Sequence, residues 1–223
     1  GVAPQIKKQR PESTDLTTNY KGRWELVSAN AGVSAMHLIV LPNNKAVMFD
    51  STVLGPSQLR LPQGHCRRMP NGYEECWAHA AEFDIETGAV RPLLVNTDTW
   101  CSSGGLNVNG TLVQAGGWLG GGRAVRYLQP CDTCDWIEYP DTLSGQRWYS
   151  TQQILPDGSF IVVGGRGMMN YEFIPAEGAR NPVNYNLPLL VETTDKYPGA
   201  ENNLYPHVHL STDGNLFILA TDR

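Results

Sequence analysis

Hydrophobic and polar positions follow the same order in four segments of the chain. Each segment starts with an apolar or alternating run, passes a polar turn, and continues in a second apolar run. Asn-Gly and Asp-Gly are strong signals for two-residue hairpin turns, because both central residues can take positive φ. The pattern predicts β-hairpins in the segments AMHLIVLPNNKAVMFD, CSSGGLNVNGTLVQAGG, YSTQQILPDGSFIVVGG and YPHVHLSTDGNLFILATD.

The spacing of these hairpins indicates a repeat. Their turns centre on Asn44, Gly110, Gly158 and Gly214, so they recur every 48 to 66 residues. A β repeat of about 50 residues with glycine pairs after the second strand is typical of kelch propellers, whose blades have four strands. Outer strands are expected in HAAEFDIETGAVRPL, RAVRYLQPC and DWIEYP.

The sequence therefore predicts an all-β, kelch-type β-propeller. Seven blades need roughly 350 residues, and this chain supplies about four of them. We expect a polar N-terminal tail over residues 1–20 and the N-terminal portion of a propeller domain over residues 21–223. The stretch from Trp24 to Val27 is expected to be an opening strand whose partner lies in missing blades.

Composition narrows the class of function. The 223 residues are 41% apolar and carry a net charge of −5. Lys and Arg are fewer than Asp and Glu and are scattered, so no nucleic-acid partner is expected. Apolar runs such as HLIVL from His37 are too short to cross a membrane. Because the chain begins at Gly1 and shows no signal peptide, we expect a mature or trimmed form.

Four of the five cysteines form close pairs, Cys66 with Cys76 and Cys131 with Cys134. Turn residues between the members of each pair favour two disulfides and an oxidising compartment. A four-cysteine zinc site is disfavoured, because the first pair is too widely spaced for it. A thioredoxin-like redox pair is disfavoured too, since no βαβ pattern surrounds the second.

Cys101 is left over, and the repeat register gives it a neighbour. The positions nine residues before the four turns are Ala35, Cys101, Tyr149 and Tyr205. Equivalent positions of propeller blades share one radius and height, so these residues are expected to approach the central axis from neighbouring blades. Propellers build sites at this axis.

The hairpins TWCSSGG…NGTLVQAGG and RWYSTQQILPDGSFIVVGG, with WELV…AMHLIVLP and YPHVHL…DGNLFI, resemble those of the copper-radical oxidases, the galactose oxidase and glyoxal oxidase family. The resemblance covers most of the chain from about Trp24 and is closest to the glyoxal oxidase branch. It implies a thioether between Cys101 and the ring of Tyr149, and copper bound by the Tyr149 oxygen.

This resemblance implies an extracellular parent enzyme that oxidises small aldehydes such as glyoxal or methylglyoxal, or primary alcohols, with O₂ to give hydrogen peroxide. Such an oxidation removes two electrons, so a phenol that holds a radical is needed beside copper(II), which accepts one. A sulfur substituent delocalises that radical and fixes the ring. Without this context, a strand Cys or Tyr is usually a packing residue.

Other positions depart from the family pattern. The family's axial tyrosine and both histidine ligands lie in segments that this chain lacks, so His207 and His209 are interpreted as structural. Gly167 stands at the offset where galactose oxidase stacks a tryptophan on its radical tyrosine. Tyr205 is expected to line the pocket. The turn alone explains Asn109-Gly110, although Asn109 begins a formal glycosylation signal.

Two hypotheses remain open at this stage. The first is the oxidase, with this chain inactive by itself because Tyr149 is its single matching copper ligand. The second is a catalytically inert kelch propeller that acts as an extracellular binding module or as a structural protein of the cell wall. The thioether crosslink and the metal discriminate between them.

Overall fold

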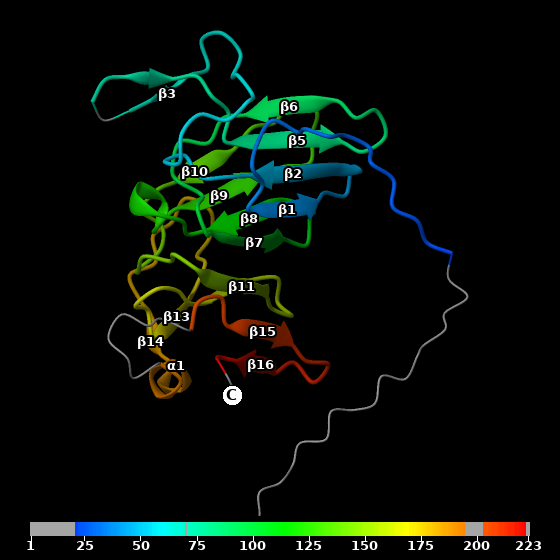
Figure 1. The fold of residues 1–223 in the computed structure, drawn as a ribbon. Coiled ribbons are helices and arrows are strands. Elements are labelled where there is room, and N and C mark those ends of the chain that lie inside the picture. The colour runs from blue at the N-terminus through cyan, green and yellow to red at the C-terminus, as the bar shows by residue number, and fades with distance from the viewer. Residues whose placement is uncertain (1–20, 70, 195–202, 222–223) are drawn as a thin grey trace, which may run out of the picture.

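The computed structural model describes residues 21–69, 71–194 and 203–221, so the expected tail over residues 1–20 lies outside the described residues. The described residues are nearly all β, with one short helix, α1 (Pro188–Glu192), and one 3₁₀ turn, η1 (Leu119–Gly121). Three four-stranded antiparallel sheets follow one another along the chain, and a two-stranded sheet comes after them (Figure 1).

Each sheet is built from consecutive segments of the chain. The first sheet contains β1 (His37–Val40), β2 (Lys45–Phe49), β5 (Ala80–Asp84) and β6 (Val90–Leu93). The second contains β7 (Ser103–Leu106), β8 (Leu112–Ala115), β9 (Val125–Leu128) and β10 (Ile137–Tyr139). The third contains β11 (Ser150–Ile154), β12 (Phe160–Gly164), β13 (Asn170–Phe173) and β14 (Tyr185–Asn186), and the fourth contains β15 (His207–Leu210) and β16 (Leu216–Leu219).

The four hairpins form where the sequence predicts them, but their turns differ from the expectation. In each, the residue named above donates its N–H to the carbonyl three residues earlier, as Gly110 does to Asn107 at 2.9 Å. Only that residue has positive φ, 79° at Gly110, while Asn109 before it does not. The loops are therefore longer turns that end in a left-handed bulge residue, not two-residue turns.

Hydrophobic cores lie between consecutive sheets. Successive strand residues point to opposite faces, so Leu112 packs toward the first sheet and Val113 toward the third. Burying both faces explains why the second strands read as continuous apolar runs. The core between the third and fourth sheets consists of Ile161, Val163, Leu190, Val208 and Ala220.

The first strands of the sheets lie side by side. β11 contacts β7 on one side and β15 on the other. A side chain added at Gly104 of β7 would come within 3.3 Å of the His37 ring on β1. The first strands of neighbouring sheets, which are equivalent in the repeat, therefore contact one another. The described residues form an open row of sheets and no closed propeller.

Disulfides join Cys66 to Cys76 and Cys131 to Cys134. The first closes a hairpin of β3 (Arg67–Arg68) and β4 (Glu74–Glu75) that projects from the first sheet (Figure 1). The stretch from Trp24 to Val27 was expected to be a strand, but it forms none, and the Trp24 side chain is fully exposed. None of the helices in the described ranges has the length and apolar character needed to cross a membrane.

Candidate functional site

Cys101, Tyr149 and Tyr205 occupy equivalent places just before β7, β11 and β15. All three have left-handed backbones, with φ of 54°, 64° and 52°. Tyr149 donates its N–H to the Cys101 carbonyl at 2.9 Å, and Tyr205 donates its own to the Tyr149 carbonyl at 2.8 Å. A left-handed non-glycine residue is unusual and persists only where its surroundings fix it. The structure thus brings the three residues that the register singled out into one chain of contacts.

The turn before Cys101 is fixed by Asp98. One Asp98 carboxylate oxygen accepts the N–H of Trp100 at 2.7 Å, and Ser102 donates its N–H to the Thr99 carbonyl at 3.1 Å. The buried guanidinium of Arg126 donates to the Asp98 carbonyl at 3.0 Å. These bonds hold Trp100 and Cys101 at the centre of a tight turn.

The Cys101 side chain meets both tyrosines, and it is the one cysteine outside the disulfides. A hydrogen bond with Cys101, with burial second, raises the pKa of Tyr149. Burial, followed by the proximity of Cys101, raises the pKa of Tyr205 strongly. The Tyr205 hydroxyl also donates to the Ser102 carbonyl at 3.3 Å. Both phenols therefore stay neutral well above neutral pH when no cation is bound.

Aromatic rings surround Tyr149. Sequence reasoning expected Tyr205 here but missed Trp148 and Trp118. The Trp148 ring centroid lies 4.6 Å from that of Tyr149, and the Tyr205 ring meets Tyr149 edge-on at 5.4 Å. Trp118 lies against Trp148 at 3.8 Å, and the Arg166 guanidinium lies over Trp148 at 5.0 Å. Rings from three loops thus gather around Tyr149, whereas a Cβ added at Gly167 meets nothing within 4 Å.

The donor set for copper is incomplete among the described residues. The Tyr149 phenol offers one oxygen ligand of a kind that copper(II) accepts. However, no group of three His, Cys, Asp or Glu side chains in the described part of the chain is placed to hold a metal ion. His207 and His209 are exposed on β15 with their rings stacked 6.3 Å apart, not packed in a core as structural residues would be. Tyr149 therefore fits as one ligand of a site that needs others.

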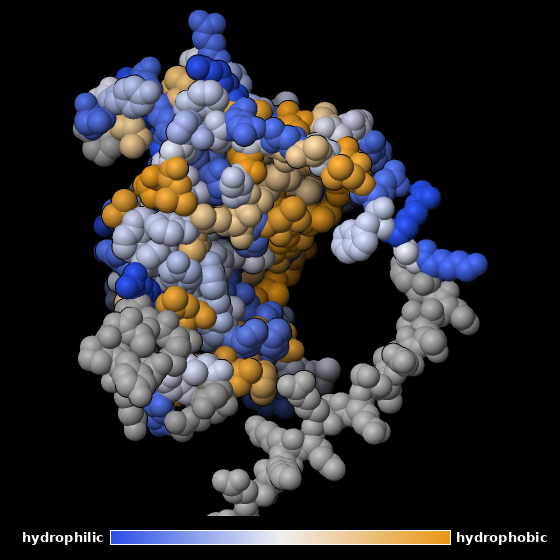
Figure 2. Space-filling model, in the orientation of Figure 1, coloured by the Kyte–Doolittle hydropathy of each residue, from blue (hydrophilic) through white to orange (hydrophobic). Residues whose placement is uncertain are grey.

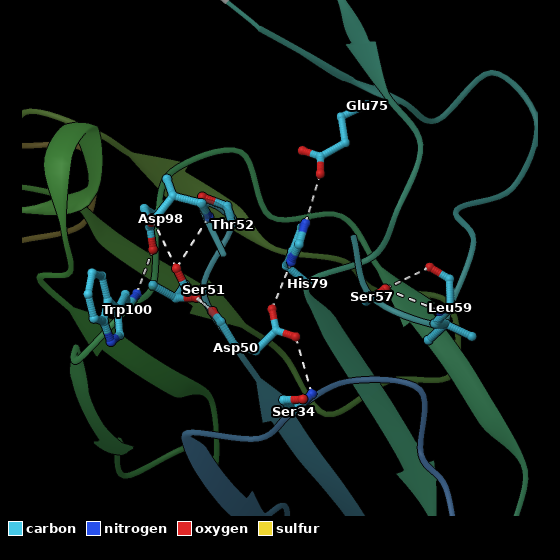
Figure 3. A network of polar contacts seen from close by, with 12 residues as sticks. Ser34, Asp50, Ser51, Thr52, Ser57, Leu59, Glu75, His79, Asp98 and Trp100 are labelled. Carbon is cyan, nitrogen blue, oxygen red and sulfur yellow. Dashed lines mark hydrogen bonds and ion pairs between the residues drawn. The ribbon is translucent and has the colours of Figure 1, made fainter. Parts of the chain in front are cut away.

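A second polar network, which sequence analysis did not find, lies at the end of the first sheet (Figure 3). The buried His79 ring bonds Asp50 through Nδ1 at 2.7 Å and Glu75 through Nε2 at 3.0 Å. Burial alone would lower the pKa of His79, but its bonds to Asp50 and Glu75 outweigh burial and raise it. Thr99 in turn donates its hydroxyl to the Asp50 carbonyl, which connects this network to the loop before Cys101.

Comparison with known proteins identifies the family. The model of the glyoxal oxidase N-terminus matches residues 36–223. The chain belongs to this glyoxal oxidase family. It is 53% identical over 209 residues to aldehyde oxidase GLOX1 of Arabidopsis thaliana, covering 92% of this chain and 34% of that protein. It is 44% identical over 209 residues to aldehyde oxidase GLOX of Vitis pseudoreticulata, covering 91% of this chain and 39% of that protein.

The match to these glyoxal oxidase relatives is partial in length, because the chain spans between a third and two fifths of each. Among solved structures, a fungal alcohol oxidase of the AA5 family in complex with copper overlaps 63% of this chain and 28% of its own. The TM-score of that overlap is 0.42 and the sequence identity is 15%. So loose an overlap does not decide the fold. The family assignment therefore stands on the sequence.

Proposed function

We propose that this chain is the N-terminal part of an extracellular copper-radical oxidase. The parent oxidises small aldehydes such as glyoxal or methylglyoxal, or primary alcohols, with O₂ and releases hydrogen peroxide. The observation that carries the proposal is the meeting of Cys101 with Tyr149. Their backbones are hydrogen-bonded at 2.9 Å, and the Cys101 side chain lies close enough to Tyr149 to raise the pKa of that phenol. Membership of a family whose relatives are aldehyde oxidases supports it.

The proposed cofactor of the chain itself is a thioether between these two residues. A C–S bond forms between Sγ of Cys101 and a Tyr149 ring carbon next to the one that bears oxygen. An S–H bond and a C–H bond break, and two electrons and two protons pass to dioxygen. The Cys101 thiol lies close enough to the Tyr149 phenol to raise its pKa, and this proximity supports the proposed bond.

In the working enzyme, copper supplies one electron acceptor and the modified Tyr149 supplies the second. Tyr149 is one copper ligand, and the others belong to parts of the protein beyond this chain. Trp148 and Tyr205 enclose the Tyr149 ring and limit access of water to it. Tyr205, with its hydroxyl anchored on the Ser102 carbonyl, forms a wall of the substrate pocket.

We propose that the row of sheets is the beginning of a kelch-type propeller of seven blades, with residues 21–223 in this one domain. The side-by-side first strands and the cores between sheets support this arrangement. Blades beyond β16 close the ring and bring in the missing copper ligands. The two disulfides support a secreted protein, because such bonds persist in oxidising compartments.

Hydrogen peroxide production by the copper-loaded whole protein tests this function. Methylglyoxal and O₂ give sustained peroxide in the wild type, and Tyr149→Phe reduces it to background because the radical phenol is removed. Tyr185→Phe on the outer strand β14 is the matched control and keeps the wild-type rate. A wild-type protein with copper that makes no peroxide from aldehydes or primary alcohols contradicts the proposal and favours an inert propeller.

A further inference from the structure

A fully buried ion pair lies next to Tyr149 in the chain. The side chains of Arg147 and Glu172 both have 0% exposure. Arg147 Nε donates to Glu172 Oε1 at 2.8 Å, and Nη2 lies 2.7 Å from the same oxygen. The other carboxylate oxygen accepts the N–H of Ser144 at 2.7 Å and the amide of Asn181 at 2.9 Å. The carboxylate of the pair is thus well provided with hydrogen bonds, whereas Arg147 Nη2 makes only the ion-pair contact.

Stability alone does not account for such a pair. Removing two charges from water costs about as much as their attraction returns, and packed apolar side chains often stabilise a fold equally well. A buried pair can instead specify one geometry among several, because its hydrogen bonds are directional. The contacts of Arg147 with the neighbouring sheets indicate which geometry this pair specifies.

Arg147 contacts two sheets at once. Its backbone N–H donates to the Gly122 carbonyl at 2.7 Å, and its carbonyl accepts the N–H of Gly117 at 3.0 Å. Both partners belong to the loop that follows β8 of the second sheet. Its guanidinium, by contrast, bonds the third sheet through Glu172 on β13 and through the Gly164 carbonyl at 2.8 Å. The residue therefore joins the two sheets that carry Cys101 and Tyr149.

We propose that Arg147, held by Glu172, is a positioning residue that sets Tyr149 against the Cys101 thiol. Tyr149 follows Arg147 by two residues, and its own N–H bonds the Cys101 carbonyl. A shift of Arg147 relative to the second sheet displaces the Tyr149 ring from the sulfur. The role of the contact between Tyr149 and Cys101 in catalysis rests on the proposed oxidase function. The positioning of Tyr149 by Arg147 does not.

The first sheet offers a matched control. Glu82 on β5 has a side chain that is 2% exposed, and Arg91 Nε donates to its Oε1 at 3.0 Å. This pair also joins a buried carboxylate to an arginine, but it borders none of the three site residues. Arg147→Met with Glu172→Leu is therefore compared with Arg91→Met with Glu82→Leu, and melting temperatures are matched by adding urea.

The first readout is the alkylation rate of the Cys101 thiol by iodoacetamide in the 223-residue chain, with both disulfides intact. We expect about a tenfold faster reaction when the Arg147 pair is replaced, because the thiol loses its tyrosine partner through local opening. The Arg91 pair variant reacts at the wild-type rate. Equal rates in the wild type and the Arg147 pair variant overturn the proposal, as do equal increases in both pair variants.

The second readout is the yield of the thioether in the copper-loaded whole protein, measured by mass. We expect the Arg147 pair variant to lose most of the crosslink and the Arg91 pair variant to keep it. A full yield without the Arg147 pair overturns the positioning role. If the wild type itself forms no crosslink, the proposed oxidase function fails, and the alkylation rates still decide the positioning claim.

Discussion

Three residues hold the site through a backbone conformation that L-amino acids rarely adopt. Cys101, Tyr149 and Tyr205 all have positive φ, and each such residue costs on the order of 1–2 kcal/mol. Backbone strain of this kind is found at functional sites, where the surroundings enforce it. In this chain it turns one thiol and two phenols toward a common point, which ordinary strand geometry would not do.

The phenol of Tyr149 reports directly on its thiol partner. In the 223-residue chain, where no thioether is expected, Cys101→Ala removes the hydrogen bond that raises the pKa of Tyr149, so this pKa falls toward its ordinary value. Phenolate absorbance against pH measures it, with Tyr149→Phe subtracted to isolate the residue. An unchanged titration in Cys101→Ala would show that the two side chains do not interact.

The turn before Cys101 leaves no room for a side chain at Gly121. A Cβ on Gly121 would sit 1.8 Å from the Asp98 carbonyl oxygen, whereas one on Gly120 meets nothing within 4 Å. We expect Gly121→Ala to lower the free energy of unfolding by about 3 kcal/mol, through overpacking against fixed backbone. Urea unfolding measures this loss.

Gly120→Ala is the control for that substitution, and it stays within about 0.5 kcal/mol of the wild type. Similar losses in both variants would mean that the Asp98 turn is not packed as described.

Residue-scale prediction from sequence succeeded for the repeat and failed for the loops. The register found Cys101, Tyr149 and Tyr205, because positions at a fixed distance from a hairpin turn are equivalent in the second, third and fourth sheets. It missed Trp148 and Trp118, whose rings meet only through loop conformations that no period describes. The sequence shows a tryptophan directly before Tyr149, but it does not show that the Trp148 ring lies against the Tyr149 ring.

At the scale of elements, the hairpin of β3 and β4 is closed by its disulfide and attached to the first sheet by charged side chains. His79 bonds Glu75 of the hairpin and Asp50 at the end of β2. Arg67 forms an ion pair with Glu75 and donates to the Thr52 carbonyl at 3.1 Å. The paired cysteines predicted the disulfide, but the histidine network was not predictable, because its members come from separate elements.

This network makes stability depend on pH in a defined direction. The pKa of His79 is raised in the folded chain, so its contribution is complete below the ordinary histidine value of about 6.5. The contribution is lost as pH rises through the folded-state pKa. We expect the free energy of unfolding to fall across this range in the wild type, and the fall to be smaller in His79→Gln.

Urea unfolding between about pH 5.5 and 8.5 measures this dependence, which lies within the range where histidines titrate. His209→Gln on β15 is the control, because that ring is exposed. A fall of equal size in the wild type and in His79→Gln would contradict a charged His79 in the network.

At the scale of the whole molecule, the row of sheets exposes apolar residues at both ends. Leu38 of β1 is 57% exposed and Phe217 of β16 is 58% exposed. Figure 2 shows hydrophobic residues gathered on the side that carries β1 and β7. The sequence predicted the order of strands and the hairpins, because patterning and turns are local. It could not settle closure, which depends on contacts between the ends of the ring.

The incomplete donor set predicts that the 223-residue chain with added copper does not turn over methylglyoxal. Tyr149 acts here as a single ligand. Its raised pKa disfavours the phenolate form that copper(II) requires. The measurement is peroxide release, with Tyr149→Phe as the control. Sustained peroxide above that control would show that the described chain holds a complete site.

The central claim is the bond between Cys101 and Tyr149, and the mass of the copper-loaded whole protein tests it most directly. After full reduction of the disulfides, we predict a mass lower than the sequence mass by two hydrogens, and one crosslinked peptide pair that contains Cys101 and Tyr149. A mass equal to that of the sequence, with the two residues recovered unmodified in separate peptides, would contradict the account.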